Sequence, residues 1–113
     1  MPARSLADVL RKPLVVAPMG GGPSTSELVV AAAEAGALGF LAAGYKTAAA
    51  MVAEIAEVRA ATSEPFGVNV FVPGEPSQDT RGVARYLESL AGDAKAVDAP
   101  LGKATWDDDD FHN

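Results

Sequence analysis

One polar side chain, Asn69, stands near the exit of an otherwise apolar run from Phe66 to Val72. The run is rich in β-branched and aromatic residues, which is typical of a strand. Alternation of side chains puts Gly67, Asn69 and Phe71 on one face of that strand. In α/β folds, ligands bind at the carboxyl ends of the strands, and an amide both donates and accepts hydrogen bonds. Asn69 is therefore either a contact for the edge of a heteroaromatic ring or a buried amide bonded to nearby backbone.

A second candidate is the segment Ala17-Pro18-Met19, which is followed by three glycines, Gly20 to Gly22. Small residues at a strand exit let a flat ligand lie against the backbone, and glycine permits a close approach. The alternative is a tight turn from strand to helix, with Met19 in the core. The glycines do not form a G-x-G-x-x-G pattern, so the sequence does not indicate a dinucleotide site.

Composition excludes several other kinds of site. The sequence has no Cys and a single His, His112, which excludes disulfides, thiolate ligands, cysteine nucleophiles and multi-histidine metal sites within this chain. The four carboxylates of Asp107–Asp110 cannot all converge on one cation, which favours a solvated acidic stretch over a metal site. Lys46 is interpreted as an exposed loop lysine, with a contact to an anion at the next helix as the alternative.

The charge balance points away from nucleic acid. Nine Lys and Arg against fifteen Asp and Glu give a net charge of −6 and a pI near 4.6, and no basic cluster could displace counterions from phosphates. No apolar stretch approaches the roughly eighteen residues that span a bilayer. The apolar run at residues 14–17 is also too short for a secretory signal. We therefore expect a cytoplasmic protein that binds neither nucleic acid nor membrane.

Three apolar runs alternate with three helical patterns. In chain order, they cover residues 14–19, 24–35, 38–44, 47–61, 66–72 and 83–98. Strands and helices in alternation predict parallel strands joined by crossovers. Parallel strands are usually covered on both faces, which explains why the runs are almost continuously apolar.

Local signals predict where the helices begin and end. Ser24-Thr25-Ser26-Glu27 matches a capping box, in which the Ser24 hydroxyl accepts from the Glu27 amide and the Glu27 carboxylate reaches back. Gly36 supplies the left-handed residue that ends this helix, and Thr47 is expected to cap the next one. That next helix carries an apolar stripe made of Met51, Val52, Ile55 and Val58.

Three strands do not close a sheet, and a closed (β/α)8 barrel needs roughly 250 residues. We therefore predict an α/β chain that forms the first three β/α units of an incomplete TIM-type (β/α)8 barrel. Residues 1–100 are assigned to this partial barrel, and residues 101–113, which show no periodicity, to an irregular acidic tail. The open strand edges of a partial barrel are expected to favour self-association.

Taken together, these segments resemble the N-terminal portion of the nitronate monooxygenase family, also called 2-nitropropane dioxygenases. The matching stretches are Pro13–Thr25, Ala35–Leu41 and Pro65–Phe71, and the tail Trp106–Asp110 is similar to a segment of bacterial members. The resemblance extends over nearly the whole chain. Its specificity comes from the spaced combination of segments, since any single segment would be weak.

The resemblance implies a flavoprotein oxidoreductase that uses FMN in a TIM-type barrel to oxidise alkyl nitronates with O2, giving carbonyl compounds and nitrite. It implies that Ala17, Pro18 and Met19 line the flavin ring and that Asn69 is the family's FMN-contacting Asn. No catalytic residue is carried over, because the family's catalytic His lies beyond this C-terminus and His112 does not match it. The family's phosphate-binding glycines come from late strands, so we expect the isolated chain to be inactive.

Two other interpretations fit these residues. A related FMN barrel, either a flavin-dependent enoyl-reductase or an NADH:quinone reductase, would differ in the later strands, where nicotinamide and substrate contacts lie. Alternatively, the chain is a truncated product without activity, which persists through association with a partner.

Overall fold

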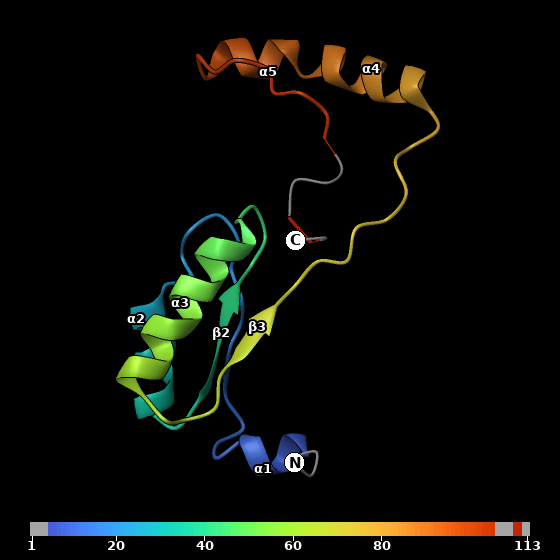
Figure 1. Ribbon diagram of the computed structural model, residues 1–113. Coiled ribbons are helices and arrows are strands. Elements are labelled where there is room, and N and C mark those ends of the chain that lie inside the picture. Colours follow the sequence, from blue (N-terminus) through green and yellow to red (C-terminus); the bar gives the residue numbers. More distant parts are fainter. Residues whose placement is uncertain (1–4, 106–109, 112–113) are drawn as a thin grey trace. The chain divides into compact units, whose positions relative to one another are not determined.

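The computed structural model describes residues 5–105, 110 and 111, which form two compact units (Figure 1). The first unit holds the described residues up to Val72 together with residues 110 and 111, and the second begins at Pro73. The predicted division into residues 1–100 and 101–113 stays a prediction. Within the described part of the chain, no helix is long and apolar enough to cross a bilayer.

A three-stranded parallel sheet forms the centre of the first unit. Its strands β1 (Val15–Val16), β2 (Leu38–Ala42) and β3 (Gly67–Asn69) stand in that order. The register is given by the aligned pairs Val15 with Leu38, Val16 with Gly39, Phe40 with Gly67, Leu41 with Val68, and Ala42 with Asn69. The alternation of apolar runs and helical patterns thus predicted the α/β class and the parallel pairing correctly.

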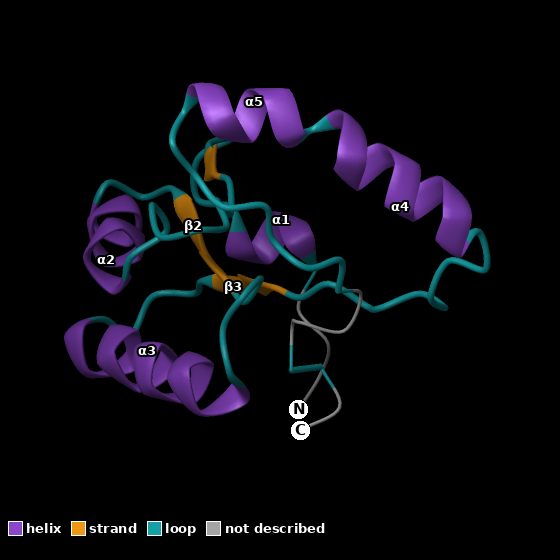
Figure 2. Cartoon of the chain, turned by 90° about the horizontal axis from the view of Figure 1, so that it is seen from above, coloured by secondary structure: helices purple, strands orange, loops and turns teal. Residues whose placement is uncertain are grey.

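Two helices, α2 (Ser26–Glu34) and α3 (Ala48–Ala61), cover one face of this sheet (Figures 1 and 2). Both match predicted helical segments. A short helix with no counterpart among the predicted elements, α1 (Leu6–Val9), precedes β1. The Ser5 backbone N–H and hydroxyl both donate to the Asp8 carboxylate, at 2.8 and 2.7 Å, and so close its first turn. The spacing Ser5-x-x-Asp8 is the sequence signal for this helix.

The core of the first unit lies between the sheet and these two helices. Leu41 of β2, Val29 of α2 and Val58 of α3 are almost completely buried, and Met51 of α3 joins them. Val68 of β3, which is aligned with Leu41, packs against the same cluster. Apolar contact between the sheet and both helices therefore holds the unit together.

Helix α3 begins where the sequence predicts, because the Thr47 side chain accepts the Ala50 N–H at 3.2 Å. Its apolar stripe is narrower than predicted. Met51 and Val58 are buried, whereas Val52 is 66% exposed. Successive residues point about 100° apart around a helix, so Val52 turns away from the sheet, and the prediction for this residue is wrong.

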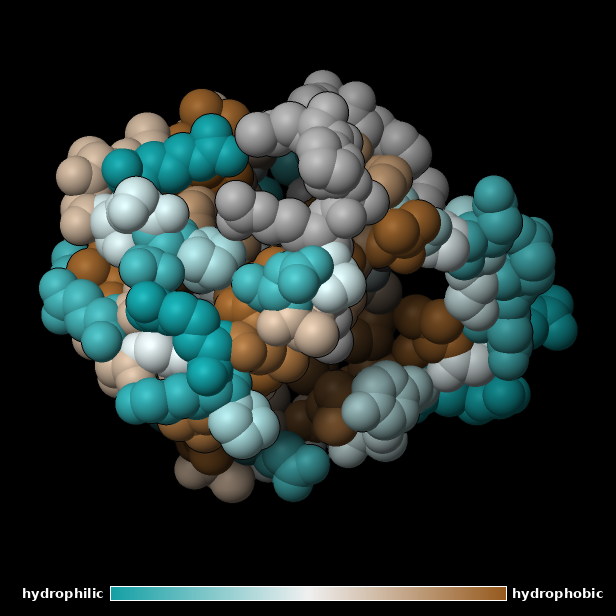
Figure 3. All heavy atoms as spheres, turned by 90° about the horizontal axis from the view of Figure 1, so that it is seen from below, coloured by the Kyte–Doolittle hydropathy of each residue, from teal (hydrophilic) through white to brown (hydrophobic). Residues whose placement is uncertain are grey.

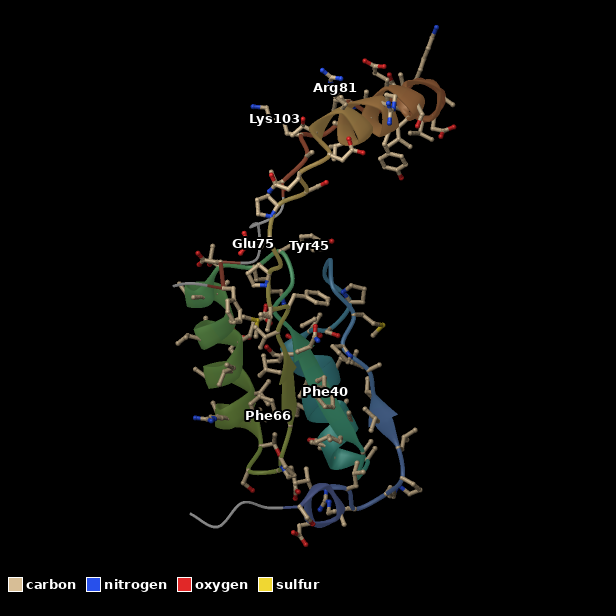
Figure 4. All side chains as sticks on the ribbon, turned by 90° about the vertical axis from the view of Figure 1, so that its right-hand side faces the viewer. Phe40, Tyr45, Phe66, Glu75, Arg81 and Lys103 are labelled. Atoms are coloured by element: carbon tan, nitrogen blue, oxygen red, sulfur yellow. The ribbon has the colours of Figure 1, made fainter. Side chains whose placement is uncertain are left out.

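The other face of the sheet carries the residues that alternate along each strand with those that face the core. Phe40 and Gly67 are aligned there, and a Cβ on Gly67 would collide with the Phe40 ring. Ala42 and Asn69 follow on the same face, two aligned pairs closer to the carboxyl ends. Figure 4 shows Phe40 on the sheet. The side chain of Asn69 therefore belongs to the face that α2 and α3 leave uncovered.

Strand β3 is shorter than its apolar run. It ends at Asn69 because its partner strand ends at the aligned residue Ala42 and the chain then turns away. Residues 70–72 have no partner strand in the part of the chain that the structure describes, and they are exposed. The predicted extent of 66–72 is therefore wrong at its carboxyl end, although the strand itself is confirmed.

Ser24 does not cap α2. Its hydroxyl accepts the Met19 N–H at 2.7 Å, and the cap is Thr25, whose side chain accepts the Leu28 N–H at 3.2 Å. The predicted capping box is therefore wrong by one residue. The apolar run of the first strand is also longer than β1, which stops before Pro18, a residue without an N–H.

Two basic side chains hold the segment before β1 against the end of α2. Lys12 donates to the Ala35 carbonyl at 2.6 Å. Arg11 donates to a carbonyl of the last turn at 2.9 Å and pairs with Glu64 at 3.0 Å. Gly36 has a φ of 80°, as predicted for the residue that ends this helix. Cations at a helix C-terminus also complement its dipole.

The second unit contains α4 (Thr80–Ser89) and α5 (Ala91–Ala96), where the sequence predicts one continuous helix. The break falls at Leu90, whose N–H bonds to the Leu87 carbonyl at 3.1 Å. A bond to the third residue back belongs to a tighter turn than an α-helix makes. The predicted helix is therefore two shorter ones.

Adding a single methyl group at Gly39 should push α2 away from β2. A Cβ on Gly39 would lie 3.1 Å from the Val29 Cα and 3.2 Å from its carbonyl oxygen. We predict that Gly39→Ala lowers the free energy of opening β2 by about 1–3 kcal/mol, because backbone must move to make room. Faster hydrogen exchange of the β2 amides would measure this. Gly74→Ala, where a Cβ meets open space, is the control, and equal exchange in both variants would contradict the prediction.

We propose that the outer edges of β1 and β3 promote self-association, since the sheet order leaves one edge of each without a described partner strand. Leu14, which precedes β1, and Val15, the first residue of β1, are exposed. The surface seen from below also shows hydrophobic residues (Figure 3). Sedimentation velocity should show a mass that rises with concentration, and Val15→Lys should reduce the rise by adding charge to the edge. A monomer mass at every concentration would disprove this.

Candidate functional site

The carboxyl ends of the three strands lie along one edge of the sheet, because the strands are parallel. β1 leads into Ala17-Pro18-Met19, β2 leads into Ala43-Gly44-Tyr45, and β3 ends at Asn69. The Ala43 N–H donates to the Asn69 carbonyl at 3.0 Å, which extends the pairing one residue past β2. All the residues that the sequence singles out for ligand binding are therefore at this edge, where α/β folds bind their ligands.

Asn69 is half-buried and lies beside Ala42 on the face that the helices do not cover. Among the described residues, none hydrogen-bonds to its side-chain amide. The alternative of an amide bonded to neighbouring backbone therefore does not apply within this part of the chain. Its oxygen and its NH2 group keep their capacity to accept from and donate to a ligand.

The loop after β1 presents backbone to the solvent. Met19 is 42% exposed, so the alternative that places it in the core is wrong. Gly21 and Gly22 have φ values of 79° and 122°, a region that side-chain-bearing residues rarely adopt. Apart from the adjacent residues of the chain, no described residue has an atom within 4 Å of the position that a Cβ would take on either glycine. A flat ligand can therefore approach the backbone of this loop closely.

Tyr45 belongs to the same edge, although no sequence pattern indicates it. Its φ of 65° is left-handed, which is uncommon for an aromatic residue and is frequent at functional sites. Its ring lies 3.9 Å from the position of a Cβ on Gly20, and the residue is 73% exposed. Figure 4 shows Tyr45 at the carboxyl end of the sheet. The turn after β2 thus places an aromatic ring beside the glycine loop after β1.

The helix N-termini at this edge are occupied by the chain's own oxygen atoms. Thr25 caps α2, and the Asp110 carboxylate accepts the Ala48 N–H at the start of α3, at 2.8 Å. Lys46 is paired with Glu54 at 2.7 Å, and only 21% of its side chain is exposed. The interpretation of Lys46 as an exposed loop lysine is therefore wrong, and its charge is already matched. These groups do not offer an anchor for a phosphate.

The described residues hold no cluster of three or more His, Asp or Glu side chains arranged for a metal ion. Asp107–Asp109 and His112 lie outside the described residues, and Asp110 acts at the start of α3. A cavity of about 240 Å³ near this edge is lined by Val68 and Val70 and not by Met19, Tyr45 or Asn69. The candidate residues instead lie along the exposed strand ends, where Met19 and Tyr45 are open to solvent.

The fold defines an α/β protein with a parallel sheet. The carboxyl edge of this sheet, where α/β folds bind their ligands, carries a glycine loop, an exposed aromatic ring and an amide that has no hydrogen bond to the described residues. A family model described as nitronate monooxygenase matches residues 4–109. The chain belongs to the nitronate monooxygenase family, as its sequence segments predict.

Two bacterial relatives support this assignment. A Bacillus subtilis (strain 168) protein named "Probable nitronate monooxygenase" is 45% identical over 64 residues, which are 57% of this chain and 18% of that protein. A Staphylococcus haemolyticus (strain JCSC1435) protein of the same name is 43% identical over 68 residues, or 60% of this chain and 19% of that protein. The chain thus spans about a fifth of the length of these curated relatives.

A solved structure gives the same result for the fold. The crystal structure of nitroalkane oxidase from Streptomyces ansochromogenes superposes with a TM-score of 0.83 and 45% sequence identity. The match covers 95% of this chain and 30% of that chain. The likeness therefore extends over almost all of this chain and less than a third of the solved protein.

Glu27 lies in the first turn of α2. Its own backbone N–H, and then the Thr25 side chain, hydrogen-bond the carboxylate and lower the pKa of Glu27 below its ordinary value of 4.5. A carboxyl whose pKa is lower in the folded state stabilises that state at any pH above its ordinary pKa. This stabilisation is lost as the pH falls through the lowered pKa. We predict that the first turn of α2 loosens below pH 4.5, which an NMR titration of the Leu28 amide would detect. Glu27→Gln should abolish this transition and Glu34→Gln should keep it; an unchanged titration in Glu27→Gln would refute the assignment.

Proposed function

We propose that this chain supplies the flavin-ring side of the FMN site of a nitronate-oxidising enzyme, and that it forms the first three β/α units of a (β/α)8 barrel. The observation that carries the proposal is the amide of Asn69 at the end of β3, which lies on the face that the helices leave uncovered and has no hydrogen bond to any residue that the structure describes. Membership of the nitronate monooxygenase family and the likeness to a nitroalkane oxidase support it.

The residues at the strand ends fit the ring of FMN. Asn69 can both donate to and accept from the polar edge of a flavin, while Ala17, Pro18 and Met19 offer small or apolar groups to its flat face. When bound, FMN supplies the electron transfer between an alkyl nitronate and dioxygen that yields a carbonyl compound and nitrite. The part of this chain is to hold the ring and to shield one side of it from water.

The phosphate of FMN needs an anchor from elsewhere in the barrel. At this edge, Asp110 occupies the start of α3, and Lys46 is neutralised by Glu54. In TIM barrels, the phosphate usually sits at the loops after strands seven and eight. The proposal therefore assigns ring and phosphate to different parts of the barrel. This edge holds no His or Cys among the described residues, so a His that acts as the catalytic base would come from elsewhere in the barrel.

Lumiflavin, which has the ring of FMN without the phosphate, tests the ring platform directly. We expect the 113-residue chain to bind lumiflavin and FMN with similar, weak affinity and to lose both on desalting, because the phosphate finds no anchor. Asn69→Ala should weaken lumiflavin binding by roughly five- to a hundredfold, since the hydrogen bonds lost correspond to about 1–3 kcal/mol. Quenching of flavin fluorescence during a titration would measure both affinities.

Gln78→Ala is the matched control, because Gln78 is the other amide side chain among the described residues and donates to the Pro76 carbonyl of its own loop at 3.3 Å. It should leave flavin affinity unchanged. Equal lumiflavin affinity in wild type and Asn69→Ala would refute the role of Asn69. FMN retained after desalting would refute the claim that this chain lacks a phosphate anchor. If the wild type binds no lumiflavin, the claim that the strand ends bind the flavin ring is refuted.

A chimera tests the activity. This chain would replace the matching 30% of the Streptomyces ansochromogenes nitroalkane oxidase. We expect the chimera to bind FMN and to consume oxygen when an alkyl nitronate is added, whereas the 113-residue chain alone should give no turnover above that of free FMN. A folded, flavin-loaded chimera without nitronate-dependent oxygen uptake would contradict the proposed function.

A further inference from the structure

We propose that Ser24 is a positioning residue for the flavin ring, because it holds the glycine loop after β1 in the shape that the ring platform needs. The inference rests on the proposed function. Ser24 is only 1% exposed, and burying a hydroxyl is unfavourable unless it is hydrogen-bonded. Its hydroxyl accepts the Met19 N–H at 2.7 Å. A fully buried polar group is thus committed to the backbone of a ligand-facing loop.

This hydrogen bond closes the loop at its base. Met19 and Ser24 flank the segment 20–23, so the bond between them fixes the ends of the turn that contains Gly21 and Gly22. None of the described residues makes a hydrogen bond to Gly20, Gly21 or Gly22. Three consecutive glycines have little conformational preference of their own. The shape of the loop therefore depends on its tether to Ser24.

The Tyr45 ring also lies near the loop. The Tyr45 ring lies 3.9 Å from the position of a Cβ on Gly20, whereas Ser24 holds Met19 from the buried side. Without the tether, Met19 could move relative to Asn69, which is fixed in β3 by its alignment with the central strand. A ring that touches both parts of the platform would then bind more weakly, because binding has to order the loop.

Ser26 provides a matched comparison on the same stretch of chain. It is also buried, at 8% exposure, and its hydroxyl also makes one hydrogen bond of 2.7 Å. That bond goes to the Glu57 carboxylate and links α2 to α3, away from the loop. If Ser24 had a merely structural role, removing either hydroxyl would have the same kind of effect.

The test compares Ser24→Ala and Ser26→Ala with the wild-type chain by thermal stability, lumiflavin affinity and hydrogen exchange of the Met19 amide. Both variants should lower stability. Ser24→Ala should also weaken lumiflavin binding by about five- to tenfold and speed up exchange at Met19, whereas Ser26→Ala should change neither. Ser24→Cys, which retains a weak acceptor, should fall between wild type and Ser24→Ala.

Unchanged lumiflavin affinity in Ser24→Ala, or an equal loss in Ser26→Ala, would overturn the inference and leave the proposed function standing. If the Met19 amide of the wild-type chain exchanges at the unprotected rate, its hydrogen bond to Ser24 is refuted. This measurement needs no variant, so the inference can be tested even where Ser24→Ala does not fold. A wild type that binds no lumiflavin would overturn the proposed function itself, and with it the role of Ser24 in ring binding.

Discussion

The register of β2 against its two neighbours is the constraint on which the site depends. β2 pairs on both edges, and its contacts with α2 and α3 determine which of its residues face the core. Leu41 and the aligned Val68 face the helices, so Ala42 and Asn69 face away from them. A slip of one residue would turn Asn69 into the apolar core and expose Val68. The position of the Asn69 amide is therefore set by the burial of Leu41.

Two glycines allow that register to pack on both faces. Gly39 lets the backbone of α2 approach β2, because a Cβ would meet the Val29 backbone. Gly67 leaves room for the Phe40 ring on the opposite face. Side chains at both positions would force the helix and the ring away from the sheet. Close packing at the middle of the sheet thus leaves the strand ends as the place where a ligand can approach.

Asn69 could be identified from the sequence because a lone amide in an apolar strand is costly and needs a reason. Ser24 and Tyr45 could not be identified in the same way. By spacing alone, Ser24 is typical of a helix cap, and only the folded loop shows that its partner is Met19. Tyr45 lies beside the glycine loop because its backbone has a left-handed φ and its ring approaches Gly20. Neither feature leaves a pattern in the sequence.

By itself, the sequence determined the α/β class, the order of the elements, the start of α3 and the family resemblance. These depend on periodicity and turn chemistry among residues close together in the chain. The tertiary structure decided how long each strand is, which residue caps α2 and which charges are already paired. Those outcomes depend on contacts between distant residues: β3 ends where Ala42 ends its partner, and Asp110 reaches the Ala48 N–H across the fold. A pattern in one segment cannot show what another segment will bring to it.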